Sequence, residues 1–141
     1  MRTIIGYGND LRGEDAFGRD VLKNLALKKP QNTQLLSLFQ LTPEIVLNLL
    51  ESDEIVFVDA CYSDANHYKL ACSLEEQKID TLSHHISYTM IVNMLNNLYD
   101  IYPKYEVFSM LSSQFDEVKD KIKYRQVVES VSTYLSVVEQ Y

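Results

Sequence analysis

The segment that decides the fold lies near the N-terminus and reads Ile5-Gly6-Tyr7-Gly8-Asn9-Asp10-Leu11-Arg12-Gly13-Glu14-Asp15-Ala16-Phe17-Gly18. All four glycines of the chain fall inside it. Glycine adopts backbone conformations that other residues avoid, so the backbone is expected to be irregular here. Residues 2–7 have the composition of a short strand, and apolar residues from Phe17 onward recur at helical spacing. The segment therefore predicts a strand, a glycine-rich loop and a helix.

The rest of the chain continues this alternation of strands and helices. The first helix should end at Lys28-Lys29, before Pro30. Further strands are expected at 33–39, 54–60, 68–74 and 105–110, and further helices from Thr42-Pro43-Glu44 onward, at 87–98 and at 124–139. The mixed charges of residues 111–123 favour a solvated loop or helical turn.

The order of these elements predicts an α/β fold with three α/β/α layers. We expect residues 1–141 to form a single domain around a mostly parallel sheet of about five strands. The connection between the strands at 54–60 and 68–74 is too short for a helical crossover. The strand at 68–74 should therefore be an antiparallel edge strand.

Composition excludes several classes of function. Acidic residues outnumber basic ones 20 to 13, which gives a net charge of -7 and disfavours nucleic acid and anionic membranes as partners. No apolar run approaches the length of a signal peptide core or of a membrane span. The two cysteines form no CxxC pair and no disulfide framework. We expect a cytoplasmic protein with reduced thiols, acting as a monomer.

The glycine-rich loop does not have the pattern of a nucleotide-binding loop. A dinucleotide fingerprint needs a third glycine where this chain has Leu11, and Arg12-Gly13 then lengthens the loop. A phosphate-binding P-loop needs Gly-Lys-Ser/Thr, which is absent. Nucleotide binding is therefore disfavoured.

Two carboxylates, Glu14 and Asp15, follow the loop where the helix begins. Because a helix N-terminus attracts carboxylates, a plain capping role is one interpretation. Topology favours another, since the carboxyl ends of neighbouring parallel strands meet at one crevice. Asp15 comes just after the first strand, and Asp59 closes the strand at 54–60. If these two strands are neighbours, Asp15 and Asp59 face the same crevice.

The few histidines add a possible third ligand. Residues 73–84, at roughly 3.3 Å each, can bring His85 back to the crevice. Two carboxylates and one imidazole suit a borderline divalent ion such as nickel or zinc, whereas Ca²⁺ or Mg²⁺ would prefer oxygen ligands alone. Cys61 offers a different chemistry, a thiol nucleophile paired with His84 or His85. The neighbouring Asp59 works against a thiolate, which favours an inert, partly buried cysteine.

These residues also resemble a known family. The segment from Ile5 to Gly18 is similar to the opening signature of the [NiFe]-hydrogenase maturation endopeptidases, roughly GxGNxLxGDDxxG. Val58-Asp59-Ala60 matches their second motif, and Ser83-His84-His85 resembles their SPH-type third motif. The resemblance spans roughly the first hundred residues, in order and spacing. Its motif loop comprises Gly6, Gly8, Asn9, Gly13, Glu14 and Gly18.

The resemblance implies a nickel-dependent endopeptidase. Such an enzyme removes the C-terminal extension of a hydrogenase large-subunit precursor after nickel has been inserted. Carried over by motif, the metal ligands would be Asp15, Asp59 and His85, with Asp15 also a candidate for activating water. The nickel would be carried by the substrate rather than held as a resident cofactor.

The chain departs from the family pattern at several positions. Glu14 replaces the usual aspartate, and His84 stands where proline is usual, which makes His84 an alternative ligand. Phe39-Gln40-Leu41-Thr42-Pro43-Glu44 replaces a glycine-rich segment after the second strand. The departures at Glu14 and His84 leave open a non-catalytic nickel-sensing or chaperone module of the same fold. A small-molecule hydrolase on a similar sheet is a third, disfavoured hypothesis.

Overall fold

The structure is a computed structural model that describes residues 1–63, 67–71, 86–113 and 115–137. Its strands are β1 (Arg2–Tyr7), β2 (Thr33–Leu38), β3 (Glu54–Tyr62), β4 (Leu70–Ala71) and β5 (Lys104–Ser112). Its α-helices are α1 (Phe17–Lys28), α2 (Tyr88–Tyr99) and α3 (Lys121–Val137), and two 3₁₀ helices are η1 (Gly13–Ala16) and η2 (Pro43–Asn48). In this described part of the chain, no helix has the length and apolar character needed to span a membrane.

The strands form one sheet in the order β2-β1-β3-β5-β4. β1 pairs in parallel with both β2 and β3, and β3 pairs in parallel with β5. β4 pairs antiparallel with β5 over two residues, Leu70 opposite Met110 and Ala71 opposite Ser109. The predicted α/β class is confirmed. Beyond residue 71, the strand expected at 68–74 lies outside the described residues.

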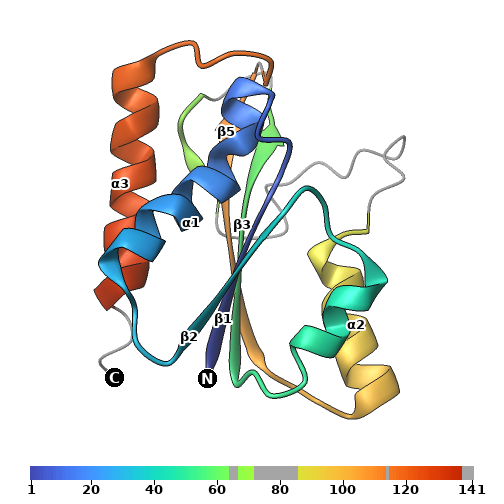
Figure 1. The fold of residues 1–141 in the computed structure, drawn as a ribbon. Coiled ribbons are helices and arrows are strands. Elements are labelled where there is room, and N and C mark those ends of the chain that lie inside the picture. The colour runs from blue at the N-terminus through green and yellow to red at the C-terminus, as the bar shows by residue number, and fades with distance from the viewer. Residues whose placement is uncertain (64–66, 72–85, 114, 138–141) are drawn as a thin grey trace.

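Helices cover both faces of the sheet (Figure 1). α1 and α3 lie on one face, and α2 and η2 lie on the other. Successive residues of β3 alternate between the two cores: Val56 and Val58 face α1 and α3, whereas Ile55 and Phe57 face α2 and η2. A continuous apolar run is needed for a strand buried on both faces. This alternation explains why residues 55–58 are all apolar and all buried.

Two glycines let α1 approach the sheet closely. A Cβ on Gly18, at the start of α1, would lie 2.1 Å from the carbonyl oxygen of Val58 and 2.9 Å from the backbone nitrogen of Tyr7. A Cβ on Gly6 would lie 2.2 Å from the carbonyl oxygen of Gly18. Only glycine fits at such contacts. Gly18 thus allows the close helix–strand packing for which a dinucleotide fingerprint uses its third glycine.

One predicted helix has a different form. The segment from Pro43 folds as the 3₁₀ helix η2, with hydrogen bonds of the three-residue type from Ile45 N to Thr42 O and from Leu49 N to Val46 O. The Thr42 side chain makes no capping hydrogen bond that would hold a first α-helical turn. A 3₁₀ helix rises about 2.0 Å per residue against about 1.5 Å in an α-helix. The connection from β2 to β3 therefore spans more distance with the same residues.

Two strands are longer than expected. β3 continues past Asp59 to Tyr62, because its pairing with β5 extends to Tyr62 opposite Ser112, whereas β1 ends at Tyr7. Asp59 is therefore not the last residue of β3. It lies at the level where β1 stops, one residue beyond the Gly6–Val58 pair. Ser112, predicted to lie in the solvated segment 111–123, is a fully buried residue of β5.

Candidate functional site

The Asp59 carboxylate is held by two hydroxyl groups from the neighbouring strands. Tyr7, at the end of β1, donates a hydrogen bond from its hydroxyl to Oδ2 of Asp59 at 2.8 Å. Ser109 of β5 donates from Oγ to Oδ1 at 2.5 Å. Each carboxylate oxygen therefore has one fixed donor. The parallel pairing of β3 with β1 and β5 brings the three side chains together.

The protonation of Asp59 is poised near neutral pH. Burial raises the pKa of Asp59 to about 6, against the lowering effect of the hydrogen bonds from Ser109 and Tyr7. The negative charge of Asp15 raises this pKa further. A carboxyl group with such a pKa exchanges a proton readily near neutral pH, or releases it when a cation approaches.

Asp15 is placed beside this group by the glycine-rich loop. The backbone N–H of Asn9 donates to Oδ2 of Asp15 at 3.3 Å, and the Asn9 side-chain oxygen accepts from the backbone N–H of Leu11 at 2.9 Å. Gly8 has a φ of +147°, and a Cβ there would lie 2.1 Å from the backbone oxygen of Asp15. Gly8 therefore lets the loop fold back onto η1. The strands before Asp15 and containing Asp59 are neighbours, and the two carboxylates interact electrostatically.

The remaining predicted site residues fall in two groups. His84 and His85 lie outside the described residues, so the ligand role predicted for them stays a prediction. Within residues 1–63, 67–71, 86–113 and 115–137, no three His, Cys, Asp or Glu side chains come close enough to hold a metal ion. Of the three predicted ligands, the described residues include two carboxylates, Asp15 and Asp59, and their ligand role also stays a prediction. Burial, aided by the charge of Asp59, raises the pKa of the Cys61 thiol, which disfavours a thiolate nucleophile there.

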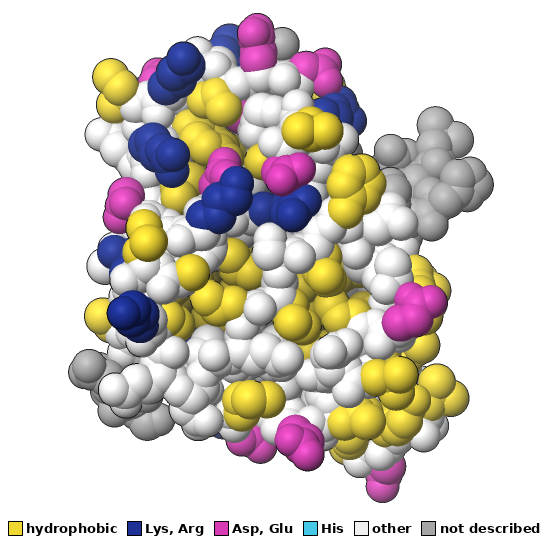
Figure 2. Space-filling view, in the orientation of Figure 1, with side chains coloured by type: hydrophobic (Ala, Val, Ile, Leu, Met, Phe, Trp, Pro, Cys, Tyr) yellow, Lys and Arg dark blue, Asp and Glu magenta, His cyan; other side chains and the backbone are white. Residues whose placement is uncertain are grey.

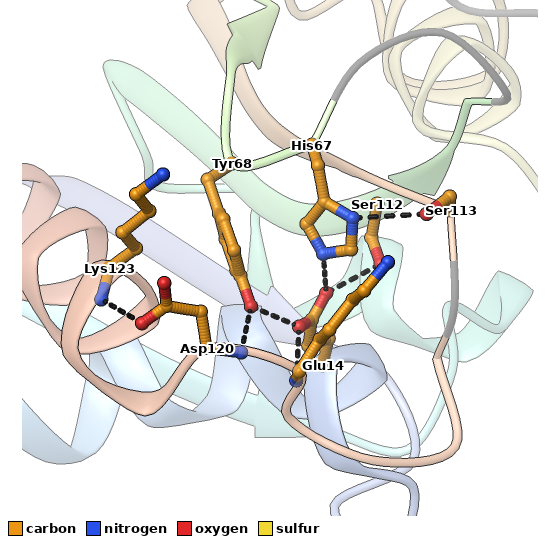
Figure 3. A network of polar contacts seen from close by, with 8 residues as sticks. Glu14, His67, Tyr68, Ser112, Ser113, Asp120 and Lys123 are labelled. Atoms are coloured by element: carbon orange, nitrogen blue, oxygen red, sulfur yellow. Dashed lines mark hydrogen bonds and ion pairs between the residues drawn. The ribbon is translucent and has the colours of Figure 1, made fainter.

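Glu14 has a different environment from the one its sequence position suggests. Its side chain is fully buried, and Figure 3 shows four groups converging on it. Oε1 accepts from Ser112 Oγ at 2.6 Å and contacts His67 Nε2 at 2.8 Å. Oε2 accepts from the Tyr68 hydroxyl at 2.6 Å and from the backbone N–H of Lys119 at 3.0 Å. All four of these partners belong to segments outside η1 and α1, so simple capping of the helix does not describe this residue.

The contacts of Glu14 keep it ionised inside the protein. Burial by itself raises the pKa of Glu14, but the hydrogen bonds from Ser112, Tyr68, Lys119 and His67 outweigh it and hold the pKa below its usual value. These donors come from the β3–β4 connection, the end of β5 and the segment before α3. The carboxylate therefore joins three segments to the loop that carries Asp15.

The segment after β5 is consequently more than a solvated loop. Besides the Lys119 contact, the backbone N–H of Glu14 donates to the Phe115 carbonyl at 3.0 Å, and a Cβ on Gly13 would collide with the backbone of Glu117. Sequence reasoning missed His67, Tyr68 and Ser112 as partners of Glu14 because they are 53 to 98 positions away. The available signal was an acidic residue inside a segment that also contains every glycine.

Comparison with solved structures shows a common fold. No family model and no curated protein sequence matches the chain. The [NiFe] hydrogenase maturation protease HycI from Thermococcus kodakarensis KOD1 superposes with a TM-score of 0.75 at 18% identity, over 99% of this chain and 92% of that one. The chain has the fold of the [NiFe] hydrogenase maturation proteases. This fold places the glycine-rich loop at the carboxyl ends of β1 and β3.

Two structures from Escherichia coli agree. The hydrogenase maturating endopeptidase HybD superposes with a TM-score of 0.69 at 17% identity, over 95% of this chain and 91% of that one. The endopeptidase HycI superposes with a TM-score of 0.75 at 14% identity, over 96% of this chain and 89% of that one. The shared architecture thus extends over nearly the whole of both chains.

Proposed function

We propose that this protein is an endopeptidase that removes the C-terminal extension of a [NiFe]-hydrogenase large-subunit precursor after nickel insertion. The observation that carries the proposal is the pair of carboxylates in the fold of such proteases: Asp59 lies in β3 at the level where β1 stops, and Asp15 lies in η1, after the loop that follows β1. In open α/β sheets, ligands bind in the crevice outside the carboxyl ends of the strands. The sequence motifs around both residues support the same activity.

In this proposal the protein recognises nickel that the precursor already carries. Asp15, Asp59 and His85 would contact the ion, and His84 is the alternative to His85. Three side chains are too few to saturate nickel, so substrate groups can complete its coordination. Recognition then depends on a loaded substrate, which makes cleavage a check that nickel has been inserted.

The residues of this chain have distinct parts in the reaction. Tyr7 and Ser109 fix the Asp59 carboxylate, which ionises fully when it meets the substrate's cation. Asp15 is the candidate for accepting a proton from the attacking water. The ion supplies Lewis acidity toward the peptide bond. Glu14 acts at a distance by joining the segments that support the Asp15 loop.

A cleavage assay tests the proposal. Purified protein is mixed with nickel-loaded or nickel-free large-subunit precursor, and the mobility shift of the shortened product is followed over time. We expect cleavage of the nickel-loaded form alone, with strong loss in Asp15→Asn and His85→Ala. Asp53→Asn is the matched control, because Asp53 is exposed at the opposite end of β3 and pairs there with the N-terminal ammonium.

Two outcomes would contradict the proposal in different ways. Full cleavage by Asp15→Asn would remove the role assigned to that residue. Tight, nickel-dependent binding of the precursor without any cleavage would instead identify a non-catalytic nickel-sensing or chaperone module.

A further inference from the structure

One edge of the sheet is open. β2 is the terminal strand, paired on one side with β1. The hydrogen bonds from Arg2 N to Asn32 O and from Gly8 N to Leu38 O show which residues of this side face β1. In a parallel strand the N–H and C=O groups of one residue point to the same side, and successive residues alternate between the two sides. Since Asn32 and Leu38 face β1, Leu36 also faces β1. The backbone groups of Leu35 and Ser37 therefore point outward, away from β1. Within the described residues, the outward groups of Leu35 and Ser37 have no backbone partner.

The residues of β2 themselves lack the features that usually protect an edge strand, although the charged side chain of Arg19, in α1, donates from Nε to Ser37 Oγ at 3.1 Å. β2 reads Thr-Gln-Leu-Leu-Ser-Leu, with no charge and no proline, whereas exposed edges are normally blunted by lysine, proline or bulges. Its leucines are half-buried, and Phe39, directly after the strand, is 57% exposed. Figure 2 shows hydrophobic side chains in the middle of this face, between the helices on either side. Such an edge is suited to pairing with another extended chain.

The open edge leads directly into the candidate site. The carbonyl of Leu38, the last residue of β2, accepts from the backbone N–H of Gly8, and Asn9 and its partner Asp15 follow in the same loop. A peptide lying along β2 would therefore run on past Leu38 to the carboxylates. This continuity favours a substrate segment over a second copy of the chain as the occupant, because a second copy has no reason to end at the loop.

We propose that the β2 edge binds the C-terminal extension of the precursor as an added strand. The backbone N–H and C=O groups of Leu35 and Ser37 would form the ladder, and apolar side chains of the peptide would lie against Leu35, Leu36 and Leu38. The identity of the peptide rests on the proposed function. The binding mode rests on the open strand alone, and it would place a scissile bond near Asp15 with few side-chain requirements.

Amide hydrogen exchange of the ¹⁵N-labelled protein tests this pairing. In the free protein, the amides of Leu36 and Leu38 should exchange slowly because they are bonded to β1, and those of Leu35 and Ser37 should exchange fast. A synthetic peptide with the sequence of the extension, at millimolar concentration, should slow Leu35 and Ser37 about tenfold or more and leave Leu36 and Leu38 unchanged. Peptides N-methylated at alternate positions provide the control. Methylation of the peptide N–H groups that face β2 should abolish the protection of Leu35 and Ser37. Methylation of the alternate N–H groups, which face away from β2, should leave the protection unchanged.

The outcomes separate this inference from the proposed function. Unchanged exchange at Leu35 and Ser37 with millimolar peptide, while nickel-loaded precursor is still cleaved, would overturn the edge pairing and leave the proposed function standing. Slowed exchange at Leu35 and Ser37 but not at Leu36 and Leu38, together with no cleavage of nickel-loaded precursor, would support the pairing and count against the peptidase activity. Protection that appears with rising protein concentration, without peptide, would show that a second copy occupies the edge and would overturn the inference.

Discussion

Replacing Glu14 with glutamine probes the buried network most directly. The substitution keeps the size of the side chain but removes its charge. At best the glutamine oxygen still accepts from Tyr68 and from the Lys119 backbone, while its amide donates to Ser112 and to a neutral His67 ring. All four contacts can therefore survive, but none of them involves a carboxylate any longer.

The expected loss of stability follows from these four contacts. A hydrogen bond to a charged group contributes about 1.5–3 kcal/mol and a neutral one about 0.5–1.5 kcal/mol, so four weakened contacts cost about 4 kcal/mol. Relief of the burial penalty of the carboxylate offsets about half of this amount. The net destabilisation is about 2 kcal/mol at pH 7. For a chain of 141 residues this corresponds to a fall in Tm of about 6 °C.

Urea unfolding of Glu14→Gln and wild type over a pH series measures this effect. Because hydrogen bonds hold the pKa of Glu14 below its usual value of 4.5, its contribution is present above that pH and is lost as the pH falls through the lower folded-state pKa. The difference between the two proteins should therefore be about 2 kcal/mol at pH 7 and shrink in acid. Glu51→Gln, at an exposed position, should change little. Equal stability of Glu14→Gln and wild type at pH 7, or a difference that does not vary with pH, would refute the reasoning.

Three further substitutions test the carboxylate site and its scaffold. Asp59→Asn should stabilise the fold by about 3 kcal/mol at pH 8 and by little below pH 4 in urea unfolding. Burial raises the pKa of Asp59 from 3.8 to about 6, and each pKa unit corresponds to about 1.4 kcal/mol, so the stability of the wild type falls as the pH rises through this range. A variant less stable than wild type at pH 8 would contradict this. Gly18→Ala should cost about 4 kcal/mol or more and leave little folded protein by circular dichroism, since its Cβ would lie 2.1 Å from the Val58 oxygen, whereas Lys23→Ala, exposed on the same helix, should fold normally. Tyr7→Phe should weaken Ni²⁺ binding about tenfold in calorimetry, because it removes a donor that orients Asp59; unchanged affinity would show that the hydroxyl does not position the ligand.

Much of the fold could be predicted because its signals are local. The strand–loop–helix unit around the glycines and the helix at 87–98 need only short-range patterns, and β1 and α2 match their predicted ranges to within one residue. The same holds for the Asp15–Asp59 pair, since Asp59 follows an apolar run in the sequence and Asp15 follows the glycine-rich loop after the first strand. Where several local structures are close in free energy, as in the segment that became η2, the pattern indicated a helical turn but not its type.

By itself, the sequence determined the alternation of strands and helices and the two carboxylates, Asp15 and Asp59, that lie close to the carboxyl ends of the strands. The tertiary structure decided that Gly18 would let α1 approach the sheet closely. Only the tertiary structure decided that Glu14 would be buried among donors from distant segments, and that Tyr7 and Ser109 would hold Asp59. It also decided that β2 would have an open edge. The physical reason is that strand order and buried polar contacts depend on which distant segments pack together, and neither charge content nor periodicity along the chain records that choice.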